Sequence, residues 1–150
     1  MPKVAILAGE PSGDMIASQL MSELNKRYKN IEYIGIGGPL MSKYGLKSYF
    51  DYSHLSIRGY FEAIKNLPKL LKFRYSLINY LLQQKPDIFI GIDAPDFNFA
   101  IEKKLKANQI PTFHYVAPSV WAWRKNRMYK MKDYMNHLFS IFPHEEAIFK

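Results

Sequence analysis

Two carboxylates, Asp93 and Asp96, follow a short apolar run at residues 88–92 that is typical of a buried strand. Ligands of open parallel sheets bind at the carboxyl ends of the strands, so a carboxylate here could reach a substrate. Asp96 directly precedes a helical pattern, and N-capping is enough to explain it. Asp93 ends the strand itself and could accept a proton from a hydroxyl nucleophile. The alternative is that Asp93 only organises its loop as a hydrogen-bond acceptor.

The loop at residues 9–14, with the sequence GEPSGD, follows the first apolar run and opens a helical pattern. It matches neither the G-x-x-x-x-G-K-[ST] loop nor the G-x-G-x-x-G fingerprint. Two interpretations stay open. In the first, the loop is a capped turn with Ser12 as the N-cap. In the second, its glycines let a polar ligand approach the backbone at a helix N-terminus.

A second glycine-containing loop, GIGGP at residues 35–39, follows the second apolar run. It offers backbone room beside a helix that we expect to begin at Pro39. The last glycine of a dinucleotide fingerprint is missing, because Leu40 and Met41 follow. A tight turn is therefore the favoured interpretation of this loop.

The segment from His114 to Arg124 carries both tryptophans of the chain, Trp121 and Trp123. A histidine inside an apolar strand is more often a core residue than a catalyst, and His114 is interpreted in that way. Two tryptophans on one loop favour a binding role. Basic residues follow at positions 124–132, and this combination suits an amphiphilic anionic ligand, a membrane interface or stacked single-stranded nucleic acid.

Short apolar runs alternate with helical patterns, which is the order that produces βαβ units and a parallel sheet. The runs are continuous rather than alternating, as in strands covered on both faces. The sequence therefore predicts an α/β fold, a Rossmann-like parallel sheet with helices on both faces. Strands are expected at residues 4–8, 33–37, 88–92, 113–116 and 138–142. Helices are expected at residues 12–28, 68–84, 97–105, around 60–64, and from 143 onward.

The composition narrows the classes of function. The chain has no cysteine, which excludes disulfides, thiolate metal sites and a cysteine nucleophile, and its four histidines are not spaced as metal ligands. From the sequence we expect neither a secretory leader nor a membrane-spanning segment, and we expect a reducing, cytosolic compartment. The net charge of +8 at pH 7 predicts attraction to an anionic partner.

Four segments of the chain resemble the lipid-A-disaccharide synthase family: VAILAGEPSGD (4–14), YIGIGGP (33–39), PDIFIGIDAPDFN (86–98) and HYVAPSVWAWR (114–124). The similarity runs through the whole chain in order, and GIDAPDFN and PSVWAWR are highly specific. The resemblance implies a GT-B glycosyltransferase built from two Rossmann-like domains. The resemblance further implies that residues 1–150 are its N-terminal, acceptor-side domain, truncated, and that the C-terminal donor domain is absent.

The resemblance also implies a reaction. Family members join UDP-2,3-diacylglucosamine to lipid X, with inversion and with neither metal nor cofactor, and release lipid A disaccharide 1-phosphate and UDP. The donor nucleotide is bound mainly by the C-terminal domain, so the isolated chain is expected to be inactive.

Residue roles follow from the same resemblance. Asp93 matches the candidate catalytic aspartate and would act as the general base. Leu40 stands where the family often has Arg, which weakens a phosphate role for the second loop, and Arg58 stands where Met is usual. Residues that match the loop motifs are expected to bind or shape the substrate site: Glu10, Ser12, Gly13, Asp14, Gly37, Gly38, Ser119, Trp121, Trp123 and Arg124.

The resemblance places the enzyme on the inner, cytoplasmic face of the cytoplasmic membrane as a peripheral protein, and implies a homodimer of the full-length form. Basic clusters at residues 65–74 and 124–132 would hold it at an anionic surface. Two alternatives stay open. One is a basic nucleic-acid-binding module, which is disfavoured because no nucleic-acid motif is recognised, so no nucleic-acid partner is expected. The other is a non-catalytic lipid-binding subunit that another polypeptide complements.

Overall fold

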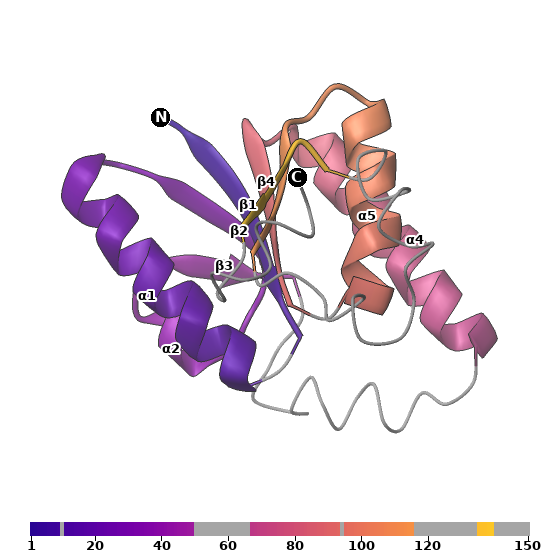
Figure 1. The fold of residues 1–150 in the computed structure, drawn as a ribbon, viewed down its shortest axis with the longest axis horizontal. Coiled ribbons are helices and arrows are strands. Elements are labelled where there is room, and N and C mark those ends of the chain that lie inside the picture. Colours follow the sequence, from indigo (N-terminus) through magenta and orange to yellow (C-terminus); the bar gives the residue numbers. More distant parts are fainter. Residues whose placement is uncertain (10, 50–66, 94, 116–134, 140–150) are drawn as a thin grey trace, which may run out of the picture.

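A computed structural model describes residues 1–9, 11–49, 67–93, 95–115 and 135–139, with residues 67–70 and 95–97 described by their backbone alone. The described part is a parallel sheet with helices on both faces (Figure 1). In chain order its elements are β1 (Lys3–Ala8), α1 (Pro11–Arg27), β2 (Glu32–Ile36), α2 (Pro39–Ser42), β3 (Leu46–Ser48), α4 (Leu67–Gln84), β4 (Ile88–Ile92), α5 (Pro95–Ala107), β5 (Thr112–Tyr115) and β6 (His137–Phe139).

The strand order is β3-β2-β1-β4-β5-β6, and every pairing is parallel. The chain first moves outward from β1 to β3. It then returns, so that β4 lies against the other side of β1, and moves outward again to β6. This is the doubly wound Rossmann order, and its topological switch point lies between β1 and β4.

Two apolar layers hold the helices to the sheet, because successive residues of a strand point to opposite faces. Ala5 and Leu7 of β1 belong to the layer beneath α4 and α5, with Leu77, Leu81 and Leu105 of those helices. Val4, Ile6 and Ala8 of the same strand belong to the layer beneath α1 and α2, with Ala17, Met21 and Met41 of those helices. Figure 1 shows the two pairs of helices on opposite sides of the sheet.

The α/β class and the parallel sheet predicted from the sequence are confirmed. Strands are present at all five expected places, and β4 has the expected bounds, whereas the short edge strand β3 was not predicted. Residue 116 and residues 140–142, the ends of the last two expected strands, lie outside the described residues. The expected helix around residues 60–64 and the one from residue 143 lie outside the described residues. Among the helices that are described, none is long and apolar enough to cross a membrane.

Two helix starts were predicted wrongly. Helix α1 begins at Pro11, so Ser12 lies within its first turn and is not the N-cap. Helix α5 begins at Pro95, so Asp96 also lies within a first turn rather than at a cap. In both cases a proline takes the first helical position, where its missing N–H costs no hydrogen bond and its fixed φ already suits the helix.

Candidate functional site

Asp93 lies at the carboxyl end of β4, beside the switch point of the sheet. Ile92 pairs with Ala8 of β1 on one side and with Tyr115 of β5 on the other. The Asp93 N–H donates a hydrogen bond of 2.9 Å to the Tyr115 carbonyl and extends the β4–β5 ladder by one residue. The sequence prediction that Asp93 ends its strand at the ligand-binding edge is therefore consistent with its place in the fold.

The backbone of Asp93 adopts the left-handed conformation, with φ of 51°. Side chains disfavour this region, although Asp and Asn tolerate it better than most residues. The side chain is half-buried, and its carboxylate has no hydrogen-bond partner among the described residues. At the edge of the sheet, Asp93 therefore offers a carboxylate to which no described residue donates a hydrogen bond.

Asn98 of α5 holds the main chain of this turn. Its side-chain amide donates to the Asp93 carbonyl at 2.8 Å and to the Ile92 carbonyl at 3.3 Å. Asn98 is fully buried, so these two hydrogen bonds form away from water. Because α5 begins two residues after Asp93, the helix delivers a donor to the end of the strand that precedes it.

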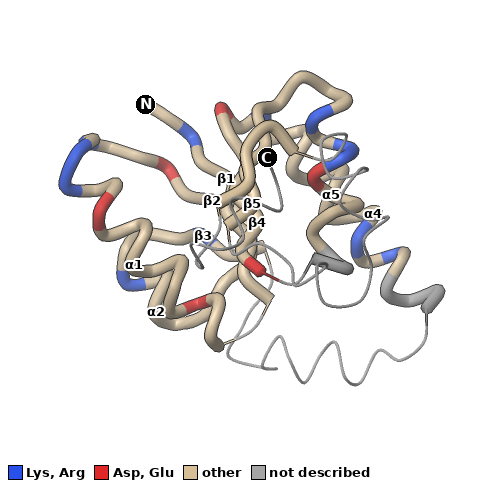
Figure 2. The backbone as a smooth tube through the Cα atoms, in the orientation of Figure 1, with Lys and Arg blue, Asp and Glu red and all other residues tan. Residues whose placement is uncertain are grey.

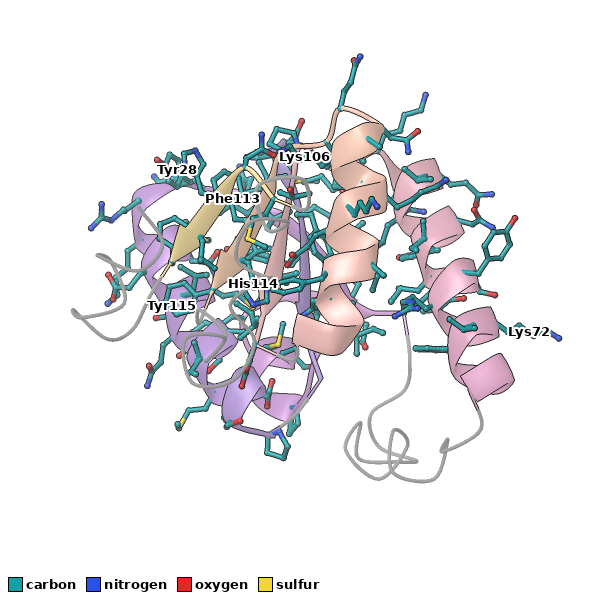
Figure 3. The ribbon with its side chains drawn as sticks, turned by 45° about the vertical axis from the view of Figure 1, so that its right-hand side comes forward. Tyr28, Lys72, Lys106, Phe113, His114 and Tyr115 are labelled. Atoms are coloured by element: carbon teal, nitrogen blue, oxygen red, sulfur yellow. The ribbon has the colours of Figure 1, made fainter. Side chains whose placement is uncertain are left out.

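One helical turn further along α5, Glu102 meets His114 of β5. Their atoms Oε1 and Nδ1 are 2.7 Å apart, and both residues are 0% exposed. The Phe99 ring lies edge-on to the His114 imidazole, with 5.0 Å between ring centroids. Figure 3 shows His114 on the side of the sheet that α5 covers. His114 is a core residue, as the sequence predicted, but it is paired with a buried carboxyl.

Burial raises the pKa of Glu102 above its usual value, and the hydrogen bond and charge of His114 act in the opposite direction. Three polar atoms of this region are buried without a hydrogen-bond partner in the described structure: Asn98 Oδ1, Glu102 Oε2 and His114 Nε2. No group of three acidic or histidine side chains among the described residues could hold a metal ion.

Asp14 has a different environment from Asp93. It is 3% exposed, and its carboxylate accepts hydrogen bonds from the N–H groups of Gly38 (2.9 Å), Leu40 (3.1 Å) and Met41 (3.1 Å). These donors belong to the start of α2, where N–H groups have no partner within the helix. Asp14 therefore fixes the second loop to the first turn of α1.

The glycines of the two loops pack against the protein itself. A Cβ at Gly38 would lie 2.5 Å from Asp14 Oδ2, and one at Gly37 would overlap Met41 Sδ. A Cβ at Gly13 would lie 3.3 Å from that of Ala8. For Gly37 and Gly38 the favoured prediction, a tight turn, is consistent with these contacts. Ser12 is exposed on the first turn of α1.

The remaining candidate residues, Glu10, Ser119, Trp121, Trp123 and Arg124, lie outside the described residues. The sequence alone did not identify Asn98, Glu102 or Gly91 as functional residues. Two features could have drawn attention to them. Asn98 and Glu102 are polar residues four positions apart, the spacing that places side chains on one face of a helix, and Gly91 interrupts an apolar strand.

A family model described as lipid-A-disaccharide synthetase matches residues 4–150 of the chain. The chain belongs to the lipid-A-disaccharide synthase family. It is 46% identical over 150 residues to a lipid-A-disaccharide synthase of Methylobacillus flagellatus, with the whole chain aligned. It is 49% identical over 148 residues to one of Haemophilus ducreyi and 47% identical over 148 residues to one of Idiomarina loihiensis, with 99% of the chain aligned in each case.

The chain spans about two fifths of the length of these relatives: 40% of the Methylobacillus protein and 38% of the Haemophilus protein. The resemblance inferred from the four sequence segments is confirmed, and with it the assignment to a family of glycosyltransferases of lipid A biosynthesis. The Rossmann-like sheet is the fold expected for one domain of a GT-B enzyme.

Proposed function

We propose that this chain is the acceptor-side domain of an inverting glycosyltransferase. The full-length enzyme joins UDP-2,3-diacylglucosamine to lipid X and releases lipid A disaccharide 1-phosphate and UDP, without a metal or a cofactor. The observation that carries the proposal is the half-buried Asp93 carboxylate beside the switch point of a Rossmann sheet, where α/β proteins bind ligands. Membership of the family supplies the substrate class.

Asp93 is the general base of the proposed reaction. Its carboxylate accepts the proton of the acceptor 6-hydroxyl while that oxygen bonds to the anomeric carbon of the donor sugar. The bond from the anomeric carbon to the UDP oxygen breaks on the opposite face, which inverts the configuration. General-base catalysis of this kind is worth about 10²–10⁴ in rate. The half-buried position of Asp93 suits this role, because the residue is partly exposed and is not shielded from an approaching ligand.

The proposed substrate contacts divide into two groups. Ser12 is exposed on the first turn of α1, where N–H groups and the helix dipole favour a polar or anionic ligand. Glu10, Ser119, Trp121, Trp123 and Arg124 complete this contacting group. Asp14, Gly13, Gly37 and Gly38 are buried, and they act by shaping the two loops rather than by touching the substrate. Most UDP contacts belong to the C-terminal domain, which the full-length enzyme also uses to form a homodimer.

A membrane surface is the proposed location, on the inner face of the cytoplasmic membrane. On α4 the side chains of Leu71 and Tyr75 are 44% and 67% exposed, and Lys72 between them is also exposed. In Figure 3 Lys72 extends away from the body of the domain. Because α4 leads into β4, its first half lies toward the carboxyl edge of the sheet, the same edge as Asp93. Exposed apolar and basic side chains on one helix suit an interface with anionic lipid.

The test of this proposal is the variant Asp93→Asn in a chain that carries both domains. We expect turnover to fall at least about a hundredfold with little change in the unfolding transition, because the amide cannot accept the proton. The matched control is Asp87→Asn, at the opposite end of β4, where the exposed carboxylate accepts a hydrogen bond from the Lys3 N–H. Near-normal turnover of Asp93→Asn would remove Asp93 from the mechanism.

A further inference from the structure

We propose that Asn98, Glu102 and His114 form a buried positioning network, which holds the Asp93 turn so that its carboxylate stays presented at the carboxyl edge of the sheet. The inference rests on the proposed function of Asp93 as the base. None of the three residues is proposed to touch the substrate. They act through the main chain of Asp93.

Asp93 is in the left-handed region, and a residue there stays in place only when its surroundings determine its conformation. Two neighbours do so. Asn98 binds the Asp93 carbonyl from α5, and the Tyr115 carbonyl of β5 accepts the Asp93 N–H. The orientation of Asp93 therefore depends on how α5 and β5 lie relative to each other.

The network links α5 to β5 at the level of the Asp93 turn. His114 directly precedes Tyr115 on β5, and Glu102 lies one helical turn after Asn98 on α5. The 2.7 Å contact between Glu102 and His114 therefore joins the two elements beside the residues that hold Asp93. A closed ring of contacts therefore surrounds the Asp93 turn. It runs from Asp93 through Asn98 to α5, across the Glu102–His114 contact to β5, and back through the Tyr115 carbonyl to Asp93.

A glycine in β4 lets polar side chains reach the sheet. Gly91 lies two residues before Asp93, and a Cβ added there would overlap Glu102 Oε1 and lie 3.2 Å from Asn98 Cγ. A side chain at this position would displace the Glu102 carboxyl and crowd Asn98. The glycine therefore lets the network pack directly against the strand that carries Asp93.

The polar character of the network supports a functional reason for it. Burying a carboxyl and an imidazole costs free energy, and apolar residues of similar volume often stabilise a core more. One polar atom of each residue, Asn98 Oδ1, Glu102 Oε2 and His114 Nε2, has no hydrogen-bond partner in the described structure. Departures of this kind from a fully satisfied core are expected at functional sites.

Hydrogen exchange of this chain tests the geometry without any need for activity. In Asn98→Ala we expect the Asp93 amide to exchange at least tenfold faster than in the unchanged chain. The matched control is Asn108→Ala, which removes a 2.8 Å hydrogen bond from a side-chain amide to the Lys104 carbonyl at the end of the same helix. The control leaves Asp93 exchange within twofold. An Asp93 amide that exchanges equally in both variants would overturn the proposal.

Two variants of Glu102 keep the test decisive should Asn98→Ala fail to fold. Glu102→Gln keeps the size and a hydrogen bond to His114, so we expect slow exchange at Asp93. Glu102→Ala breaks the link between α5 and β5, so exchange there should quicken at least tenfold. Equal exchange in the two variants would show that the link does not position Asp93.

Kinetics of a chain that carries both domains separate positioning from stability. We expect Glu102→Ala and Asn98→Ala to lower kcat at least tenfold with KM within twofold, and Glu102→Gln and Asn108→Ala to keep kcat. Loss of kcat in Glu102→Gln equal to that in Glu102→Ala would overturn a positioning role. Normal turnover of Asp93→Asn would instead contradict the role of Asp93 as the general base. In that case hydrogen exchange would still decide whether the network holds the Asp93 turn.

Discussion

The carboxylate of Asp14 accepts a hydrogen bond of 2.9 Å from the Gly38 N–H, which joins the first turn of α1 to the turn that precedes α2. Two further N–H groups share the same carboxylate, and the residue is 3% exposed. We expect Asp14→Asn to destabilise the domain by about 1–3 kcal/mol, since an amide supplies one acceptor oxygen for three donors and leaves buried groups unpaired. Chemical denaturation measures the difference.

A matched control for Asp14 lies on the same helix. Glu23 is an exposed acid of α1 whose partner is Lys26, at 2.6 Å. Glu23→Gln removes the same charge without leaving a buried donor unpaired, so we expect little change in the unfolding transition. A loss of stability as large in Glu23→Gln as in Asp14→Asn would mean that helix charge, rather than the hydrogen bonds to the second loop, explains the effect.

The space beside Gly91 gives a second prediction. Gly91→Ala places a methyl group where Glu102 Oε1 now lies, so we expect a loss of about 1–3 kcal/mol, the usual cost of overpacking a core. Gly13→Ala is the contrasting variant and should lose less stability. Its new Cβ would lie 3.3 Å from the Ala8 Cβ, and alanine favours the helix that contains this position. If Glu102 causes the clash, Glu102→Ala added to Gly91→Ala should cost less than the sum of the two single losses. Additive losses would contradict that explanation.

The buried carboxyl of Glu102 predicts a pH-dependent stability. Burial raises its pKa in the folded state, although His114 partly opposes this, and its ordinary value is 4.5. As the pH rises through 4.5, the unfolded chain loses this proton before the folded chain does, which favours unfolding. We therefore expect Glu102→Gln to become progressively more stable than the unchanged chain above pH 4.5. Urea unfolding from pH 4 to pH 7 measures the trend.

Glu23→Gln should show the opposite trend, because the hydrogen bond and charge of Lys26 lower the pKa of Glu23. The stability that Glu23 contributes is present above its unfolded pKa and is lost as the pH falls through the folded value. The Glu23 variant should therefore match the unchanged chain at low pH and fall slightly below it near neutrality. Parallel curves for the two variants would contradict the assigned environment of Glu102.

Much of the sheet follows from the sequence, because its central strands are buried on both faces and appear as unbroken apolar runs. β1 and β4 are of this kind, with the apolar segments VAILA at residues 4–8 and IFIGI at residues 88–92. β3 has three residues, LKS, of which only Leu46 is buried. An edge strand of this length has no periodicity of its own and is defined by its register with β2, which the chain acquires only on folding.

The candidate site likewise has residues that the sequence identifies and residues that only the folded structure reveals. Asp93 was identifiable because a carboxylate directly after a buried strand must lie at the sheet edge. The roles of Asn98 and Glu102 depend on contacts with Asp93 and with His114, and the α5–β5 packing that brings Glu102 to His114 cannot be derived from residue spacing. Asp14 is the opposite case. Its place in the loop motif predicted a role at the substrate site, whereas its carboxylate accepts hydrogen bonds from the start of α2.

Binding to lipid vesicles gives the last prediction. Leu71, Lys72 and Tyr75 are exposed together on α4, and we expect this chain to sediment with anionic vesicles at low salt and not with neutral ones. Lys72→Gln should weaken partitioning about fivefold, because each Lys near an anionic surface contributes about 1 kcal/mol. Lys29→Gln, an exposed change in the turn between α1 and β2, is the matched control and should have a smaller effect. Equal recovery with both kinds of vesicle would refute electrostatic attachment, and equal effects of the two variants would refute a specific role for α4.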